Sequence, residues 1–168
     1  MGLRYENLDE ETRRYMVEEI AKDLASRSIY LSNYLNPRGC DLWPRILREA
    51  AERGTDDTLA DAIIHDRCLK ERVERRKPKG GFTIAAVPRT AHETMGEGEF
   101  NRYYTRGLCR RAIEQGIDQL EVYRAKEVMQ PRPDSQQKIG LRVDPRAILE
   151  DLRHSRCRAR TRTATRSE

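Results

Sequence analysis

Residues 99–115 read EFNRYYTRGLCRRAIEQ. Apolar side chains recur along this stretch at intervals of four residues, at Phe100, Tyr104, Leu108 and Ala112, with Ile113 beside the last. That spacing places them on one face of an α-helix. Glycines precede and follow the stretch, so we predict a helix that begins near Glu97 or Glu99 and ends at Gln115.

Apolar stretches of strand length flank this helix on both sides. Residues 82–87 have the pattern of a strand with both faces partly buried, residues 120–128 form a second such stretch, and residues 138–143 a short third one. The order of strand, long helix and strand is typical of a crossover connection within one sheet. We therefore expect a small sheet that is backed by helices.

The N-terminal half of the chain carries helical patterns. Residues 8–26 have an apolar face at helical spacing, with Asn7 or Asp9 as the capping residue. A second helix is capped by Asp41, and a third is capped by Thr55. The sequence thus predicts an α+β fold: a helical N-terminal half of about three helices, then a two- to three-stranded sheet packed on a long helix and a C-terminal helix.

A basic stretch follows the third helix. Its apolar residues continue at helical spacing to Val73, and residues 67–79 contain seven basic and two acidic side chains. The stretch runs into the sequence KPKGG, and proline with paired glycines breaks a helix. This is the one internal boundary that we predict, between a helical part, residues 1–76, and a mixed part, residues 82–153.

The positive charge of the chain is concentrated near its C-terminal end. The 33 Lys and Arg residues against 28 Asp and Glu give a net charge of +5, and residues 154–168 hold five arginines and one acid. This stretch has no large apolar residue with which to offset the entropy of ordering. We predict a single domain over residues 1–153 and a disordered Arg-rich tail, which either contacts phosphates or is a solvated end.

Several classes of protein are excluded by composition. No stretch approaches the roughly 18 apolar residues of a membrane-spanning helix, and no signal peptide is present, so we expect a cytoplasmic protein with no membrane partner. The four cysteines are too widely spaced for a disulfide scaffold or a zinc framework. His65 and Cys68 are too few ligands for a metal, and we predict neither a metal nor a cofactor.

The predicted long helix carries a second set of regularly spaced side chains. Arg102, Arg106 and Arg110 recur every four residues on the side away from the apolar stripe, which predicts a solvent-facing guanidinium stripe. Guanidinium groups bind phosphates with two parallel hydrogen bonds. The alternative is that acids of the same helix, such as Glu99 and Glu114, pair with the arginines as ordinary surface ion pairs.

Further basic side chains follow the helix. Arg124 and Lys126 share one face of the predicted strand at 120–128, and Arg132 lies in the loop after it. Tyr103 adjoins the stripe as an exposed ring that could stack on a base. If the strand neighbours the helix, all these side chains form one basic surface, and we predict that surface as an anion-binding site.

Candidates for acid–base catalysis are few. His92, Glu93 and Glu97 lie between a predicted strand and the long helix, where functional loops often occur. Glu93 is also spaced from Thr90 as in a capping box, which explains it without catalysis. No nucleophile elbow, dinucleotide fingerprint or metalloprotease motif is present.

Residues 98–109, GEFNRYYTRGLC, with VYRAK at 122–126 and Pro131-Arg132, resemble an uncharacterised group of small bacterial proteins. The resemblance implies a bacterial cytoplasmic setting. It assigns no catalytic role to any residue.

Taken together, these patterns favour a non-enzymatic protein that binds an anionic partner, nucleic acid or a nucleoprotein assembly, through the arginine-rich helix and strand. Two other hypotheses stay open. An enzyme acting on a phosphate-bearing substrate would use His92 with Glu93 or Glu97 and hold the phosphate with Arg124 and Lys126. A protein–protein adaptor would instead present an apolar groove on its helical N-terminal half to a protein partner.

Overall fold

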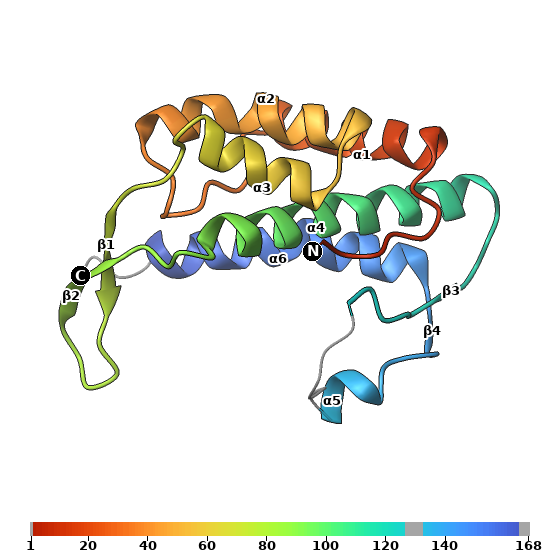
Figure 1. Ribbon diagram of the computed structural model, residues 1–168. Helices are drawn as coiled ribbons and strands as arrows, with labels where there is room; N and C mark the ends of the chain where they lie inside the picture. Colours follow the sequence, from red (N-terminus) through yellow and green to blue (C-terminus); the bar gives the residue numbers. More distant parts are fainter. Residues whose placement is uncertain (1, 127–132, 165–168) are drawn as a thin grey trace. The chain divides into compact units, whose positions relative to one another are not determined.

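The structure, a computed structural model, describes residues 2–126 and 133–164, with side chains up to His154 except those of residues 134 and 135. It is mainly helical with two small antiparallel sheets, an α+β fold as predicted (Figure 1). The chain divides into two compact units. We call Tyr30–Asn101 the inserted unit, because it interrupts the split unit, which consists of Met1–Ile29 and Arg102–Glu168.

Two helices of the inserted unit, α2 (Pro37–Arg53) and α3 (Asp56–His65), pack on each other. The Asn36 side chain caps α2 by accepting a hydrogen bond from Gly39 N at 2.7 Å. The predicted cap at Asp41 is therefore wrong, because Asn36 followed by Pro37 is itself a favourable helix start. The predicted cap of α3 at Thr55 is confirmed.

The inserted unit also contains a β-hairpin formed by β1 (Arg72–Arg76) and β2 (Phe82–Ala86), paired antiparallel. The prediction that Val73 lies on the apolar face of the third helix is therefore wrong, because α3 ends at His65 and Val73 belongs to β1. Gly80 and Gly81 have φ of 92° and 78°, and the Lys77 N–H donates to Gly81 O at 2.9 Å. Residues 77–81 thus form the turn of a hairpin, whose closed end projects away from α2 and α3 (Figure 1).

Helix α4 (Ala91–Glu114) begins earlier than the sequence predicted and runs without interruption through two glycines. A Cβ atom at Gly96 would lie 2.7 Å from the backbone oxygen of Asp56. A residue without a side chain is needed there because α4 approaches α3 closely. The helix continues through Gly96 despite the low helix propensity of glycine.

The split unit is built on α1 (Glu10–Ala25), the later part of α4, and α6 (Pro145–Ala164). Asp9, one of the two predicted caps, accepts a hydrogen bond from Thr12 N at 3.0 Å at the start of α1. The buried apolar residues of the unit come from these helices: Tyr15, Met16, Ile20, Tyr103, Tyr104, Cys109, Ala112 and Leu149.

A second small sheet in the split unit joins β3 (Leu120–Glu121) to β4 (Arg142–Val143), with α5 (Pro133–Gln136) between them in sequence. The predicted strand at 120–128 is thus much shorter in the structure. The expected crossover is also wrong: β2 pairs with β1, and β3 pairs with β4. Each sheet consists of two antiparallel strands. Helix α4 therefore connects β2 of one sheet to β3 of the other and is not a crossover within one sheet.

Helix α6 continues to Ala164 and overlaps residues 154–164 of the predicted tail. The division into one domain and a disordered tail stays a prediction. Within the described part of the chain, no helix combines the length and the apolar character that crossing a membrane requires.

Candidate functional site

The central arginine of the predicted stripe is buried. Arg106 is 1% exposed, and its guanidinium donates to both carboxylate oxygens of Asp23, at 2.6 and 2.9 Å, and through Nε to Glu19 at 2.8 Å. The prediction that Arg106 faces solvent is wrong. Glu19 and Asp23 are one turn apart on α1, so both carboxylates meet the same guanidinium.

Glu19 is the centre of a larger network in the split unit. Arg110 donates to it at 3.2 Å, and Arg153 of α6 donates to both of its carboxylate oxygens. Burial alone would raise the pKa of the Glu19 carboxyl, but Arg153 and Arg106 outweigh it and hold this pKa below the ordinary value. The arginine charges here are therefore neutralised within the fold.

Tyr103, which we predicted to be exposed, is fully buried, and its hydroxyl donates to Asp23 at 2.8 Å. Arg102 donates to the backbone oxygen of Leu152 at 2.5 Å. Arg110 also pairs with Glu18 at 3.4 Å, so its acidic partners come from α1 rather than from α4 as the ion-pair alternative supposed. The predicted guanidinium stripe is mostly a set of helix-to-helix contacts.

The other predicted basic residues lie elsewhere in the split unit. Arg124 donates to Gln136 Oε1 at 2.6 Å, and Lys126 is exposed. Arg132 lies outside the described residues. Arg106, the central residue of the predicted helix-and-strand surface, is therefore not part of any surface. That the remaining basic residues bind an anion stays a prediction.

The acid–base candidates begin α4 in the inserted unit. His92 Nε2 lies 3.9 Å from Glu93 Oε1, and the Glu93 side chain is 61% exposed. His92 Nδ1 is buried and has no hydrogen-bond partner among the described residues. Arg124 and Lys126, the predicted phosphate ligands, belong to the split unit, so the catalytic hypothesis gains no support from either unit alone.

A surface that the site prediction missed is the β1–β2 hairpin. It carries five exposed basic side chains and one acid, Glu74. None of the five forms an ion pair within the described part of the chain: Arg72, Arg75, Arg76, Lys77 and Lys79. By contrast, Arg45 and Arg48 of α2 are paired with Glu49 and Glu52.

One face of this hairpin, which we call the ribbon face, combines charge with exposed apolar side chains. The register pairs Arg72 with Ala86, Glu74 with Ile84, and Arg76 with Phe82, and paired residues share a face. Phe82 is 63% and Ile84 67% exposed. Every residue of the ribbon face is exposed, whereas the opposite face holds the buried Val73.

The sequence did hold a signal for this hairpin. A Gly-Gly pair directly before a strand, preceded by a stretch of strand length, is typical of a hairpin turn. Our prediction instead treats residues 67–79 as the basic end of a helix.

No protein-family model, no curated protein and no solved structure matches this chain. The function of the chain is therefore inferred from its own residues.

Proposed function

We propose that the protein binds nucleic acid and that the β1–β2 hairpin is its contact element. The observation that carries the proposal is the ribbon face, where arginines with no ion pair among the described residues lie beside the exposed Phe82 and Ile84. The class of partner is the one that the sequence favoured, but the contact surface is moved from α4 to the hairpin.

Charge supports this assignment. The α1 carboxylate Glu19 forms ion pairs with Arg106, Arg110 and Arg153. The hairpin arginines have no such partner within the described residues. Cationic side chains that no acid neutralises attract a polyanion and release its counterions on binding.

Shape and apolar exposure point to the same partner. A two-stranded β-ribbon fits the major groove of a duplex. An exposed aromatic ring can stack on an unpaired base or wedge between base steps. Phe82 and Ile84 on a projecting hairpin would favour aggregation in a protein without such a partner.

The test is a salt titration of binding, followed by fluorescence anisotropy, with a mixed-sequence DNA duplex and one of its strands as probes. The full chain is compared with the double variant Arg72→Gln/Arg76→Gln. We expect weaker binding and a plot of log affinity against log salt that is shallower by about 0.9 per lost phosphate contact on duplex DNA.

The matched control is Arg45→Gln/Arg48→Gln, which removes the same charge from exposed arginines of the same unit. It should change the affinity much less. Equal losses in the two double variants would show that net charge alone drives binding, and no binding by the parent chain would reject the proposal.

The Arg-rich tail is tested separately by replacing its five arginines with serine in the full chain. We expect lower affinity for both probes, because the tail adds nonspecific attraction. The difference between the hairpin variant and its control should persist in this background.

A further inference from the structure

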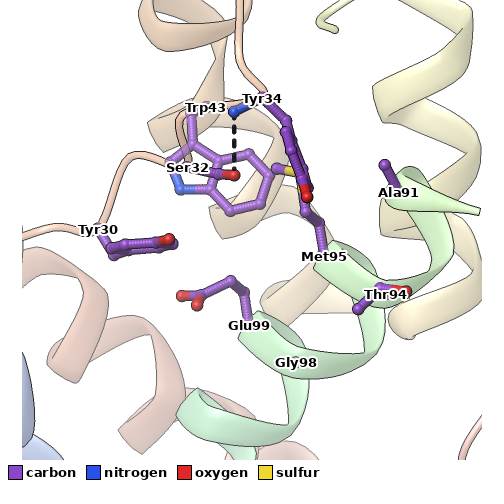
Figure 2. A pocket seen from close by; sticks show the side chains of 9 residues that line it. All are labelled: Tyr30, Ser32, Tyr34, Trp43, Ala91, Thr94, Met95, Gly98 and Glu99. Carbon is purple, nitrogen blue, oxygen red and sulfur yellow. Dashed lines mark hydrogen bonds between the residues drawn. The ribbon is translucent and has the colours of Figure 1, made fainter. Parts of the chain in front are cut away.

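The ribbon face is an open surface of the inserted unit and not part of a cavity. The pocket of this unit lies at the start of α4, and the residues that line it include Tyr30, Tyr34 and Glu99 (Figure 2). No residue of the β1–β2 hairpin, which the structure describes in full, lines that pocket. A projecting two-stranded ribbon suits a partner that offers a groove, and the major groove of B-DNA, which is about 12 Å wide, admits such a ribbon.

The hydrogen bonds of the hairpin determine how close the side chains of the ribbon face lie to one another. The Lys77 N–H donates to Gly81 O and the Val87 N–H donates to Glu71 O, both at 2.9 Å. In an antiparallel pair, hydrogen-bonded pairs alternate with non-hydrogen-bonded pairs, whose side chains lie closer together. The three pairs of the ribbon face fall at the non-hydrogen-bonded positions of this register. Their side chains therefore form one compact array.

A single carboxylate lies at the centre of this array. Glu74 is two residues from Arg72 and two from Arg76 along β1. Its side chain is exposed and forms no ion pair within the described part of the chain. A carboxylate repels phosphate groups, so it would weaken a surface that met phosphates alone. The centre of the ribbon face is better suited to a hydrogen-bond donor.

The base edges of a duplex provide such a donor between two rows of phosphates. In the major groove cytosine presents its N4 amino group, from which a carboxylate accepts a hydrogen bond. A strand rises by about 3.3–3.4 Å per residue, which places the Cα atoms of Arg72 and Arg76 about 13 Å apart. This distance is close to the groove width of about 12 Å. The two arginines can thus reach phosphates at the edges of the groove while Glu74 lies over the bases.

We propose that the ribbon face binds in the major groove of duplex DNA and that Glu74 is its specificity-determining residue. The Glu74 carboxylate accepts a hydrogen bond from the N4 amino group of cytosine. Ile84, which pairs with Glu74 across the two strands, contacts the carbon edge of the same base. The inference rests on the proposed nucleic-acid binding and adds to it a preference for sites that contain G·C pairs.

The test compares binding to three G·C duplexes of identical sequence by fluorescence anisotropy: one unmodified, one with N4-methylcytosine and one with 5-methylcytosine. In N4-methylcytosine a methyl group replaces the amino hydrogen that faces the major groove, whereas 5-methylcytosine keeps that hydrogen. We expect the N4-methyl duplex to bind about fivefold more weakly or worse than the unmodified one, and the 5-methyl duplex to bind no more weakly. Equal binding of the N4-methyl and unmodified duplexes would overturn the inference. Equal losses with both methylated duplexes would also overturn it, because they would reflect crowding of the groove.

Glu74→Met removes the carboxylate and keeps a side chain of similar length. The matched control is Glu71→Met, because Glu71 is an exposed acid two residues before Val73 and therefore on the opposite face. Loss of a negative charge alone should raise the affinity for every duplex, and we expect this of the control. Glu74→Met should instead bind the unmodified duplex more weakly than the parent chain and should no longer distinguish it from the N4-methyl duplex. If Glu74→Met gained affinity for both duplexes as the control does, Glu74 would act through its charge alone and the inference would be wrong.

Failure of this inference is distinguishable from failure of the proposed function. A protein that binds DNA with a steep salt dependence but binds all three duplexes equally keeps the proposed function and loses the role of Glu74. The same holds if it binds a single strand more tightly than the duplex. A protein that binds no DNA loses both.

Discussion

Arg106 of α4 and Asp23 of α1 face each other as a two-point ion pair: Nη1 lies 2.6 Å from Oδ2, and Nη2 lies 2.9 Å from Oδ1. Both side chains are nearly inaccessible to solvent. Two charges removed from water are tolerated only when each is paired, so neither residue can be replaced alone without cost.

Replacing Arg106 with Met is expected to lower the free energy of unfolding by about 3–5 kcal/mol, because Asp23 is left as a buried charge without its cation. The measurement is urea denaturation at pH 7. Arg110→Met is the control: Arg110 is 28% exposed, and its loss should cost about 1 kcal/mol or less. Equal losses would contradict the central role of Arg106.

Acid should destabilise the protein through Glu19. Its pKa in the folded state is lower than the ordinary value of 4.5, so the folded state favours the ionised form. This contribution is fully present above about pH 5 and is lost as the pH falls through the lowered pKa. Denaturation midpoints measured against pH should show this loss. Glu19→Gln should be less stable at pH 7 and should lose part of the dependence on acid.

Two glycines of α4 should respond to alanine in opposite directions. A Cβ atom at Gly107 would lie 2.8 Å from Met16 Cγ and 2.9 Å from Thr12 O, so Gly107→Ala should destabilise by about 1–3 kcal/mol. Gly98→Ala meets no neighbour and should stabilise by about 0.5–1 kcal/mol through helix propensity alone. Thermal denaturation of both variants checks the prediction, and stabilisation by both would mean that α1 and α4 are not so closely packed.

The apolar residues of the ribbon face should matter for binding rather than for folding. Phe82→Ser and Ile84→Ser remove side chains that are mostly exposed, so stability should change by no more than about 0.5 kcal/mol. Affinity for the DNA probes should fall in the same variants. A large loss of stability with unchanged affinity would show that these side chains serve the fold instead.

The sequence predicted the elements whose signals are local. The caps of α1 and α3 are read from neighbouring side chains, and the α+β class follows from the patterns of the two halves. The start of α4 was misplaced, because Gly96 looks like a helix breaker until the closeness of Asp56 is known.

The errors about the site have a different cause. Arg106 lies opposite the apolar stripe of α4, and only the distant acids of α1 make its burial favourable. No pattern within α4 reveals those partners. The hairpin was missed because four of the five residues of β1 are charged. Its sequence therefore lacks the alternation of apolar and polar residues that identifies a strand.

The insertion of Tyr30–Asn101 into the split unit has a consequence for how the chain assembles as it is synthesised. Helix α1 is synthesised before the inserted unit, whereas Arg106 follows Asp23 by 83 residues and Arg153 follows Glu19 by 134 residues. All residues of the inserted unit are made before either arginine. Contacts between such distant residues form slowly, so Glu19 and Asp23 lack these arginine partners while the inserted unit is synthesised. We therefore expect α1 to pack against the later part of α4 and against α6 only after the inserted unit has been made.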